Sequence, residues 1–188
     1  MATLTPTLTL SSSDMNGDTL NLSVTDSLSI LGQVTTKQVV SSTTSTRFAA
    51  AANYTKSYVY IKNLSTTAAE TISIEEIAVD STCDLTNDAT VAMDSTAKLS
   101  VGMTVSGTGV TAGQTIASIT SATAFELSAV ADGGTLNNST LTFGMPEYMT
   151  LGAGEFAFFP WASTVDLACA SAQGTPTLEV RIYQEAAA

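Results

Sequence analysis

Apolar and polar positions alternate along much of this chain of 188 residues. Over residues 20–24 leucine and valine alternate with asparagine and serine, and over residues 178–182 aliphatic residues alternate with charged ones. A period of two places every second side chain on the same face of an extended strand. Both segments are therefore predicted to be half-buried β-strands.

The middle of the chain contains further strand patterns. Tyr58–Asn63 is rich in aromatic and β-branched residues, which predicts a strand with Val59 and Ile61 on its buried side. The apolar phase shifts by one position across Glu75-Glu76, which predicts a β-bulge or a strand break. In the first third of the chain only Phe48–Ala52 has a helical composition, and it is too short to be stable alone. The chain is therefore predicted to be all-β, folded as a sandwich or a barrel.

The N-terminal residues allow three interpretations. Leu8 and Leu10 precede a polar stretch that contains Asn16-Gly17, a pair that favours a tight hairpin turn because it supplies positive φ angles. The same stretch fits a long loop. The first residues, about 1–13, equally fit an extended arm, and an arm of this kind is predicted to add a strand to a neighbouring sheet edge.

The polar stretch also contains a candidate cation site. Asp14, Asn16 and Asp18 place oxygen atoms at alternate positions, as a Ca²⁺ loop does. The stretch differs from an EF-hand loop, because its glycine stands at the fourth position and no glutamate stands at the twelfth. We interpret it as a turn rich in Asx residues and predict no metal site.

A change in composition marks a second unit. Residues 80–144 are rich in glycine and threonine, and no lysine or arginine occurs between Leu99 and Val180. Short strand patterns separated by turn signals occur in this region, at residues 103–105, 114–119, 125–127 and 141–143. We interpret residues 80–144 as a small β module inserted in a loop of a host β-sandwich made of residues 1–79 and 145–188.

The densest aromatic stretch lies near the C-terminal end. Phe156 and Phe158 share one face of a predicted strand there, and Phe159 and Trp161 share the other. A strand that is apolar on both faces must be covered on both, by the sandwich interior or by another subunit. Both explanations stay open, and Pro160 is expected to end the strand or to place it at a sheet edge. The candidate interface residues are Leu8, Leu10, Phe156, Phe158, Phe159 and Trp161.

Composition and charge exclude several kinds of chemistry. The chain has no histidine, so a Ser-His-Asp triad and a histidine metal site are both excluded. Its 17 acidic and 6 basic residues give a net charge of −11, which disfavours nucleic-acid binding. Cys83 and Cys169 do not have zinc-site spacing, and the glycine-rich run 101–113 lacks the lysine of a phosphate loop. No catalytic residue and no cofactor are predicted.

The sequence also disfavours contact with a membrane. No apolar run approaches the roughly 18 residues that a membrane-spanning helix needs. The N-terminus has no basic region ahead of an apolar segment, so a secretory signal is not expected.

Two parts of the chain resemble proteins of tailed-bacteriophage virions. The run from Leu99 to Thr120, followed by Ala124–Ser128, resembles a β module that recurs in phage head decoration and tail proteins. Tyr58–Asn63 and Leu151–Phe156 are similar to segments of small phage proteins that decorate or cement a capsid. The resemblance implies a jelly-roll-like β-sandwich with a small inserted β domain, and it carries no catalytic residues.

The resemblance implies a structural function. We expect a non-enzymatic protein on the outer surface of a virion capsid, made in the host cytoplasm, with the major capsid protein as its partner and a homotrimer as its form. The alternative is a tail, fibre or baseplate protein involved in host attachment. A secreted carbohydrate-binding module and an enzyme acting through carboxylates are disfavoured, the former by scarce aromatic residues, 6% of the chain.

Overall fold

The chain is all-β over the residues that the structure describes, which are 1–15, 18–145 and 148–186 of this computed structural model. Its strands are β1 (Ala2–Leu4), β2 (Thr7–Met15), β3 (Asp18–Thr25), β4 (Leu28–Val40), β5 (Thr46–Ala49), β6 (Ser57–Asn63), β7 (Ile72–Leu85), β8 (Thr90–Ala92), β9 (Thr104–Gly107), β10 (Ile116–Ser121), β11 (Ala124–Leu127), β12 (Leu136–Gly144), β13 (Met149–Leu151), β14 (Phe156–Trp161), β15 (Asp166–Ser171) and β16 (Thr177–Glu185). The segment of helical composition, Phe48–Ala52, ends β5 and begins a single 3-10 turn, η1 (Ala51–Asn53).

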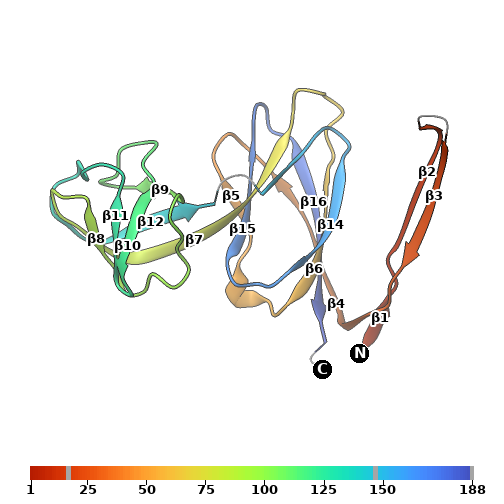
Figure 1. Cartoon of the computed structure of the whole chain (residues 1–188), viewed down its shortest axis with the longest axis horizontal. Coiled ribbons are helices and arrows are strands. Elements are labelled where there is room, and N and C mark those ends of the chain that lie inside the picture. Colours follow the sequence, from red (N-terminus) through yellow and green to blue (C-terminus); the bar gives the residue numbers. More distant parts are fainter. Residues whose placement is uncertain (16–17, 146–147, 187–188) are drawn as a thin grey trace.

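The middle of the molecule is a β-sandwich (Figure 1). One layer has the strand order β4-β16-β6-β14, with β1 beside the start of β4. The other contains β5, β15, the first half of β7, and β13. Within these layers β4 pairs with β16, β5 with β15, β6 with β14 and β7 with β13. The pairs are therefore nested: the first of these eight strands in the sequence pairs with the eighth, the second with the seventh, the third with the sixth and the fourth with the fifth. The fold is thus a β-sandwich of antiparallel strands, and its jelly-roll form stays a prediction.

Alternating side chains of both layers fill the sandwich interior. Val59 and Ile61 of β6 are fully buried there beside Leu178, Val180 and Ile182 of β16, as predicted. Burial of such aliphatic side chains stabilises the fold by about 1.5–3 kcal/mol each. The sandwich therefore has a continuous core of its own.

The strand predicted over residues 20–24 forms, but its predicted burial is wrong. Leu22 and Val24 of β3 are exposed, although their pattern matches that of the buried β16. Strand β3 pairs only with β2, in a two-stranded sheet separate from the other two. No second layer packs on this pair among the described residues, so the apolar side chains stay at the surface.

Strands β8 to β12 form a second lobe with its own core. They pair with the second half of β7 and enclose a cluster of buried side chains that includes Phe125 and Phe143, whose rings meet edge to face at a centroid distance of 5.4 Å. Strands β9 and β10 are at opposite ends of the strand order in this sheet. The backbone N–H of Gly102, just before β9, donates to the carbonyl oxygen of Ile116 in β10, and this hydrogen bond brings the two ends together. The predicted domain boundaries stay a prediction, because β7 runs without interruption from one core into the other.

Glycine permits a close backbone approach in this lobe. Gly109 has a φ of +88°, and a Cβ atom on Gly133 would collide with the Cα atom of Gly109. Two loops therefore cross at a point where only glycine fits.

The β-bulge or strand break predicted at Glu75-Glu76 is wrong. The pairing of β7 with β15 is regular at these residues. An irregularity in β7 lies later in the strand, where the three residue steps from Asp80 to Cys83 pair with only two residue steps of β12. Ile77 is buried on the opposite face of the strand from Ile72 and Ile74, whereas Val79 is exposed, so the apolar pattern changes there without a bulge. The interruption therefore lies inside the second lobe, and β7 enters that lobe as an unbroken strand.

The lobes and the β2–β3 pair are arranged in a row (Figure 1). The second lobe lies at one end, the sandwich is in the middle, and the β2–β3 hairpin stands away from the sandwich at the other end. Among the described residues no helix has the length and apolar character needed to span a bilayer.

Candidate interaction surface

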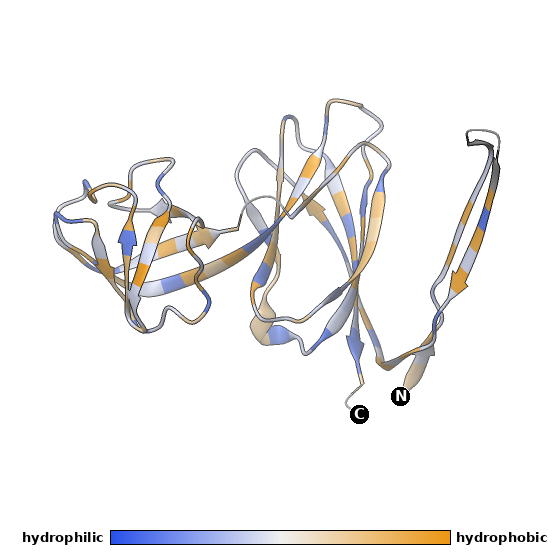
Figure 2. Cartoon of the chain, viewed as in Figure 1, coloured by the Kyte–Doolittle hydropathy of each residue, from blue (hydrophilic) through white to orange (hydrophobic). Residues whose placement is uncertain are grey.

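The hairpin of β2 and β3, called the arm here, has one apolar and one hydroxyl-bearing face. Leu8 lies opposite Val24, and Leu10 lies opposite Leu22. Residues directly opposite each other in an antiparallel pair share a face. The apolar face of the arm therefore consists of Leu8, Leu10, Leu20, Leu22 and Val24, and Figure 2 shows hydrophobic segments on both strands.

The structure decides between the interpretations of the N-terminal residues. The predicted hairpin is confirmed by the pairing from Thr7–Thr25 to Met15–Asp18. A single extended arm over residues 1–13 and a long loop are both wrong, because β3 pairs with β2 along its length. Asn16 and Gly17 lie outside the described residues, as do the side chains of Asp14 and Asp18, so the candidate cation site falls outside what the structure describes.

The base of the arm is held on the sandwich. Strand β1 pairs with β4, with Ala2 opposite Ile30 and Leu4 opposite Leu28. The backbone N–H of Asp26 donates to the carbonyl oxygen of Pro6 at 3.1 Å, which joins the two strands of the arm where they leave the sandwich. Proline fixes its own φ angle, so this link is stiff. The arm is therefore anchored at one end only.

The sandwich layer beside the arm carries aromatic rings on its outer surface. The rings of Tyr58 and Phe158 stack with centroids 6.0 Å apart, and those of Tyr60 and Phe156 lie 6.1 Å apart. Strand β16 adds Tyr183, which lies opposite Tyr58. The outer aromatic face is defined as Tyr58, Tyr60, Phe156, Phe158 and Tyr183.

One cation is fixed within this face. The guanidinium carbon of Arg181 lies 5.9 Å from the centroid of the Tyr60 ring, a cation–π distance. Arg181 also donates two hydrogen bonds to Oε1 of Glu179, at 2.6 and 3.0 Å. The pKa of Arg181 is raised above its usual value, chiefly by this side-chain hydrogen bond. The guanidinium plane is thereby held against the ring.

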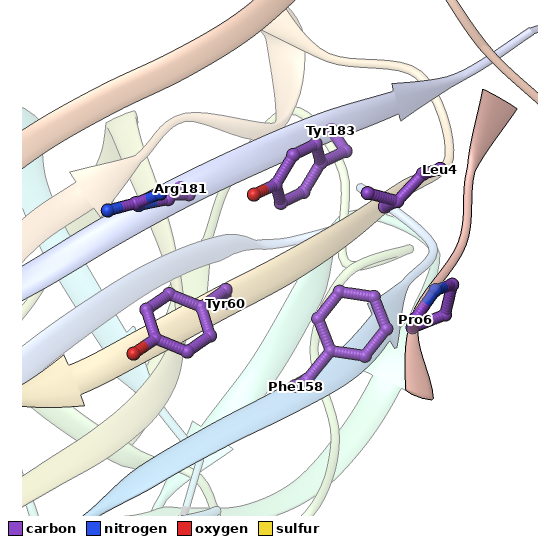
Figure 3. A pocket seen from close by; sticks show the side chains of 6 residues that line it. All are labelled: Leu4, Pro6, Tyr60, Phe158, Arg181 and Tyr183. Atoms are coloured by element: carbon purple, nitrogen blue, oxygen red, sulfur yellow. The ribbon is translucent and has the colours of Figure 1, made fainter. Parts of the chain in front are cut away.

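A groove separates the arm from the outer aromatic face. Figure 3 shows its part nearest the N-terminus, a hollow of about 240 Å³ lined by Leu4, Pro6, Tyr60, Phe158, Arg181 and Tyr183. An adjoining hollow has Leu8 and Val24 of the arm on one side, and Tyr58, Phe158 and Pro160 on the other. The apolar face of the arm and the outer aromatic face therefore line the same open groove.

The candidate interface residues divide between surface and core. Leu8, Leu10, Phe156 and Phe158 are exposed, whereas Phe159 and Trp161 are 9% and 4% exposed and lie in the sandwich core. The indole N–H of Trp161 donates to the carbonyl oxygen of Val165 at 3.2 Å. Four of the six residues are thus placed where a partner can reach them, and their role in an interface stays a prediction.

Sequence reasoning missed most of the outer aromatic face. Tyr58 and Tyr60 alternate with the buried Val59 and Ile61, so their outward direction was already implied by the pattern. Tyr183 follows the same rule on β16. The missing information was that β6, β14 and β16 are neighbours in one layer, which brings rings from three distant segments together.

The two cysteines lie in the cores, away from this surface. Cys83 and Cys169 are free and fully buried. Burial raises the pKa of each thiol to about 12, with a smaller contribution from Asp80 for Cys83 and from Glu75 for Cys169. Across the part of the chain that the structure describes, no group of three or more His, Cys, Asp or Glu side chains is arranged to hold a metal ion.

Searches of protein-family models, of curated proteins and of solved structures each found no match to this chain. Function is therefore inferred from the surfaces of the molecule itself.

Proposed function

We propose that this chain is a non-enzymatic structural protein of a bacteriophage virion that binds the outside of the capsid and stabilises it. The observation that supports this proposal is that the two ends of the molecule carry different kinds of surface. The arm lies at one end of the molecule, next to the sandwich layer that carries the outer aromatic face, and the second lobe lies at the other end (Figure 1). A decoration protein needs both a surface that binds protein and a solvated surface that points outward.

The first end has the composition of a protein-binding surface. Tyrosine, phenylalanine and arginine are enriched in the buried centres of protein interfaces. Phe156 is 62% exposed and Phe158 is 39% exposed, so both rings lose water contact when a partner covers them. The groove beside them accepts an extended segment or a ribbon of another chain.

The second end has the composition of a solvated surface. Residues 80–144 contain six carboxylates, Asp80, Asp84, Asp88, Asp94, Glu126 and Asp132, against the single cation Lys98. Like charges on neighbouring copies repel each other and keep particles dispersed. Copies bound side by side on a shell would therefore present an acidic outer layer.

The expected experiment uses the wild-type chain in purified virions. We expect hundreds of copies per particle, distributed over the shell in electron micrographs, and a higher temperature of capsid rupture when the chain is bound. Absence from the particle, or no effect on rupture, contradicts the proposal. Matched particles that lack the chain are the control.

The alternative function is host attachment from a tail, fibre or baseplate. The position of the acidic lobe favours it, because a chain bound through its arm end would project that lobe toward a host cell (Figure 1). A few dozen copies at one vertex, together with binding of the isolated chain to host cells, would support this alternative over the capsid role.

A further inference from the structure

We propose that the arm of one copy packs its apolar face on the outer aromatic face of a second copy. The starting observation is an unsupported β-ribbon. Leu8, Leu10, Leu22 and Val24 are 42–52% exposed, and they lie side by side on one face of the arm. A two-stranded ribbon is at best marginally stable in water unless a further layer covers its apolar face.

The same chain carries a surface that suits this ribbon. The outer aromatic face is flat and sheet-like, and β14 at its margin is the last strand of its layer. The ribbon is exposed on its apolar face, and the outer aromatic face is exposed at Phe156 and Phe158, whereas its three tyrosines are partly exposed. A second copy supplies both surfaces at once, so an exchange of arms leaves neither exposed. This complementarity selects a second copy over an unrelated protein.

The base of the arm explains why the arm does not cover its own sheet. Strand β1, Pro6 and the Asp26 hydrogen bond hold the arm at a distance from β14, with the groove open between them. Closure onto its own sheet would require this stiff base to bend. Exchange between copies forms the same kind of contact without that change, as domain swapping does in other oligomers.

Charge favours the same contact. The first 27 residues contain Asp14, Asp18 and Asp26 and no lysine or arginine. The outer surface of the sandwich layer carries Arg181 and Lys62, and Lys62 forms no ion pair among the described residues. Glu179 on the same face binds Arg181 and lies opposite Lys62, so these three side chains carry a net charge of +1, which favours an arm that contains no cation.

The size of the contact is sufficient for a pair. Strand β2 has nine residues, so the ribbon is about 30 Å long and roughly 10 Å wide. A reciprocal exchange covers two such ribbon faces and two sheet faces, about 1,200 Å² in all, which is the lower end of stable interfaces. The contact is therefore expected to hold copies together at micromolar concentrations.

The first test measures mass in solution in the absence of any particle. Light scattering of the full wild-type chain should give a closed multiple of 19.3 kDa. Combined Leu10→Ser and Leu22→Ser substitutions should weaken association by about 30-fold or more. The matched control, Thr9→Ala with Ser23→Ala on the hydroxyl-bearing face, should keep the wild-type mass. A wild-type monomer, or an unchanged mass of the leucine variant, overturns the proposal.

The second test distinguishes exchange from closure within one chain. Co-expressed copies carry either Leu10→Cys or Phe158→Cys, so that a disulfide between the engineered thiols must join two chains. The native thiols are buried and do not compete. A cross-linked pair supports arm exchange. If a disulfide forms only when both substitutions are in one chain, the arm closes on its own sheet. This result overturns the proposal of arm exchange.

Arm exchange and the proposed capsid contact use the same surface of the chain, and the two proposals are tested separately. Self-association without particles, with no binding to capsids, supports arm exchange and contradicts the decoration role. Capsid binding by a strictly monomeric chain supports the decoration role and contradicts arm exchange. Fluorescence of Trp161, which lies in the sandwich core, reports that each variant is folded.

Discussion

Cys83 and Cys169 show how burial alone sets the chemistry of a residue. Each is fully buried in a different core, and each has its pKa raised to about 12. The cause is mainly the cost of placing a thiolate among apolar side chains. Both thiols therefore act as small hydrophobic groups in the folded chain.

The pKa of each thiol is higher in the folded chain than in the unfolded chain, and this difference makes the stability of the fold depend on pH. Below pH 9 the thiols are neutral in both the folded and unfolded chain, since their ordinary pKa is 9.0. Above it only the unfolded chain ionises, so the free energy of unfolding falls between pH 9 and about 12, by up to about 1.4 kcal/mol per pH unit for each thiol. Urea unfolding at a series of pH values measures this slope.

The control for this experiment removes the thiols. In a variant with Cys83→Ala and Cys169→Ala, the free energy of unfolding should fall less steeply between pH 9 and about 12 than in the wild type. Equal slopes in the two proteins would contradict the burial of the thiols as the cause.

At the scale of an element, β14 has two apolar faces with different surroundings. Phe159 and Trp161 pack inward, with the ring of Phe159 5.8 Å from that of Tyr148 and the ring of Trp161 5.7 Å from that of Tyr54. Phe156 and Phe158 are exposed on the outer surface, and Phe158 lines the groove. The core thus covers one face of the strand, and the other face is at the surface, where cover by another subunit stays a prediction.

The two faces of β14 predict unequal effects of the same substitution. Phe159→Ala removes a buried ring and should lower the free energy of unfolding by about 3–5 kcal/mol. Phe156→Ala alters an exposed ring and should change it by about 1 kcal/mol or less in the monomer. Denaturation followed by circular dichroism at low protein concentration compares them. An equal loss in both variants would contradict the assigned directions.

At the scale of the whole molecule, one strand joins two cores. The first half of β7 contributes Ile72 and Ile74 to the sandwich core, and its second half contributes Cys83 and Leu85 to the other lobe. The single tryptophan, Trp161, lies in the sandwich core, so its fluorescence reports on that core alone. The coupling between the lobes can therefore be measured.

A substitution in the second lobe tests whether the lobes unfold separately. Phe125→Ala should destabilise that lobe by about 3–5 kcal/mol, because Phe125 is fully buried. We expect part of the circular dichroism transition to shift to lower denaturant, while the fluorescence transition of Trp161 keeps its midpoint. The exposed Val101→Ala is the control. A joint shift of both signals would show one cooperative unit, in disagreement with the predicted domains.

The sequence by itself determined the class of the fold and the faces of most strands. Alternation with a period of two assigns side chains to faces without knowledge of any partner, so Val59, Ile61 and the apolar residues of β16 were placed correctly. Strands β9 to β12 of the second lobe were also found, because turn signals mark their ends, but β8 was not.

Only the tertiary structure decided which faces are covered. Residues 20–24 and 178–182 have the same pattern, yet the first lies on an arm with no second layer and the second lies inside a sandwich. Burial depends on what packs opposite a strand, and that partner is set by contacts between distant segments such as β4 and β16. The groove between arm and sheet arises in the same way. The pattern along the chain determined which side chains share a face, and the path of the chain in space determined which of those faces are exposed.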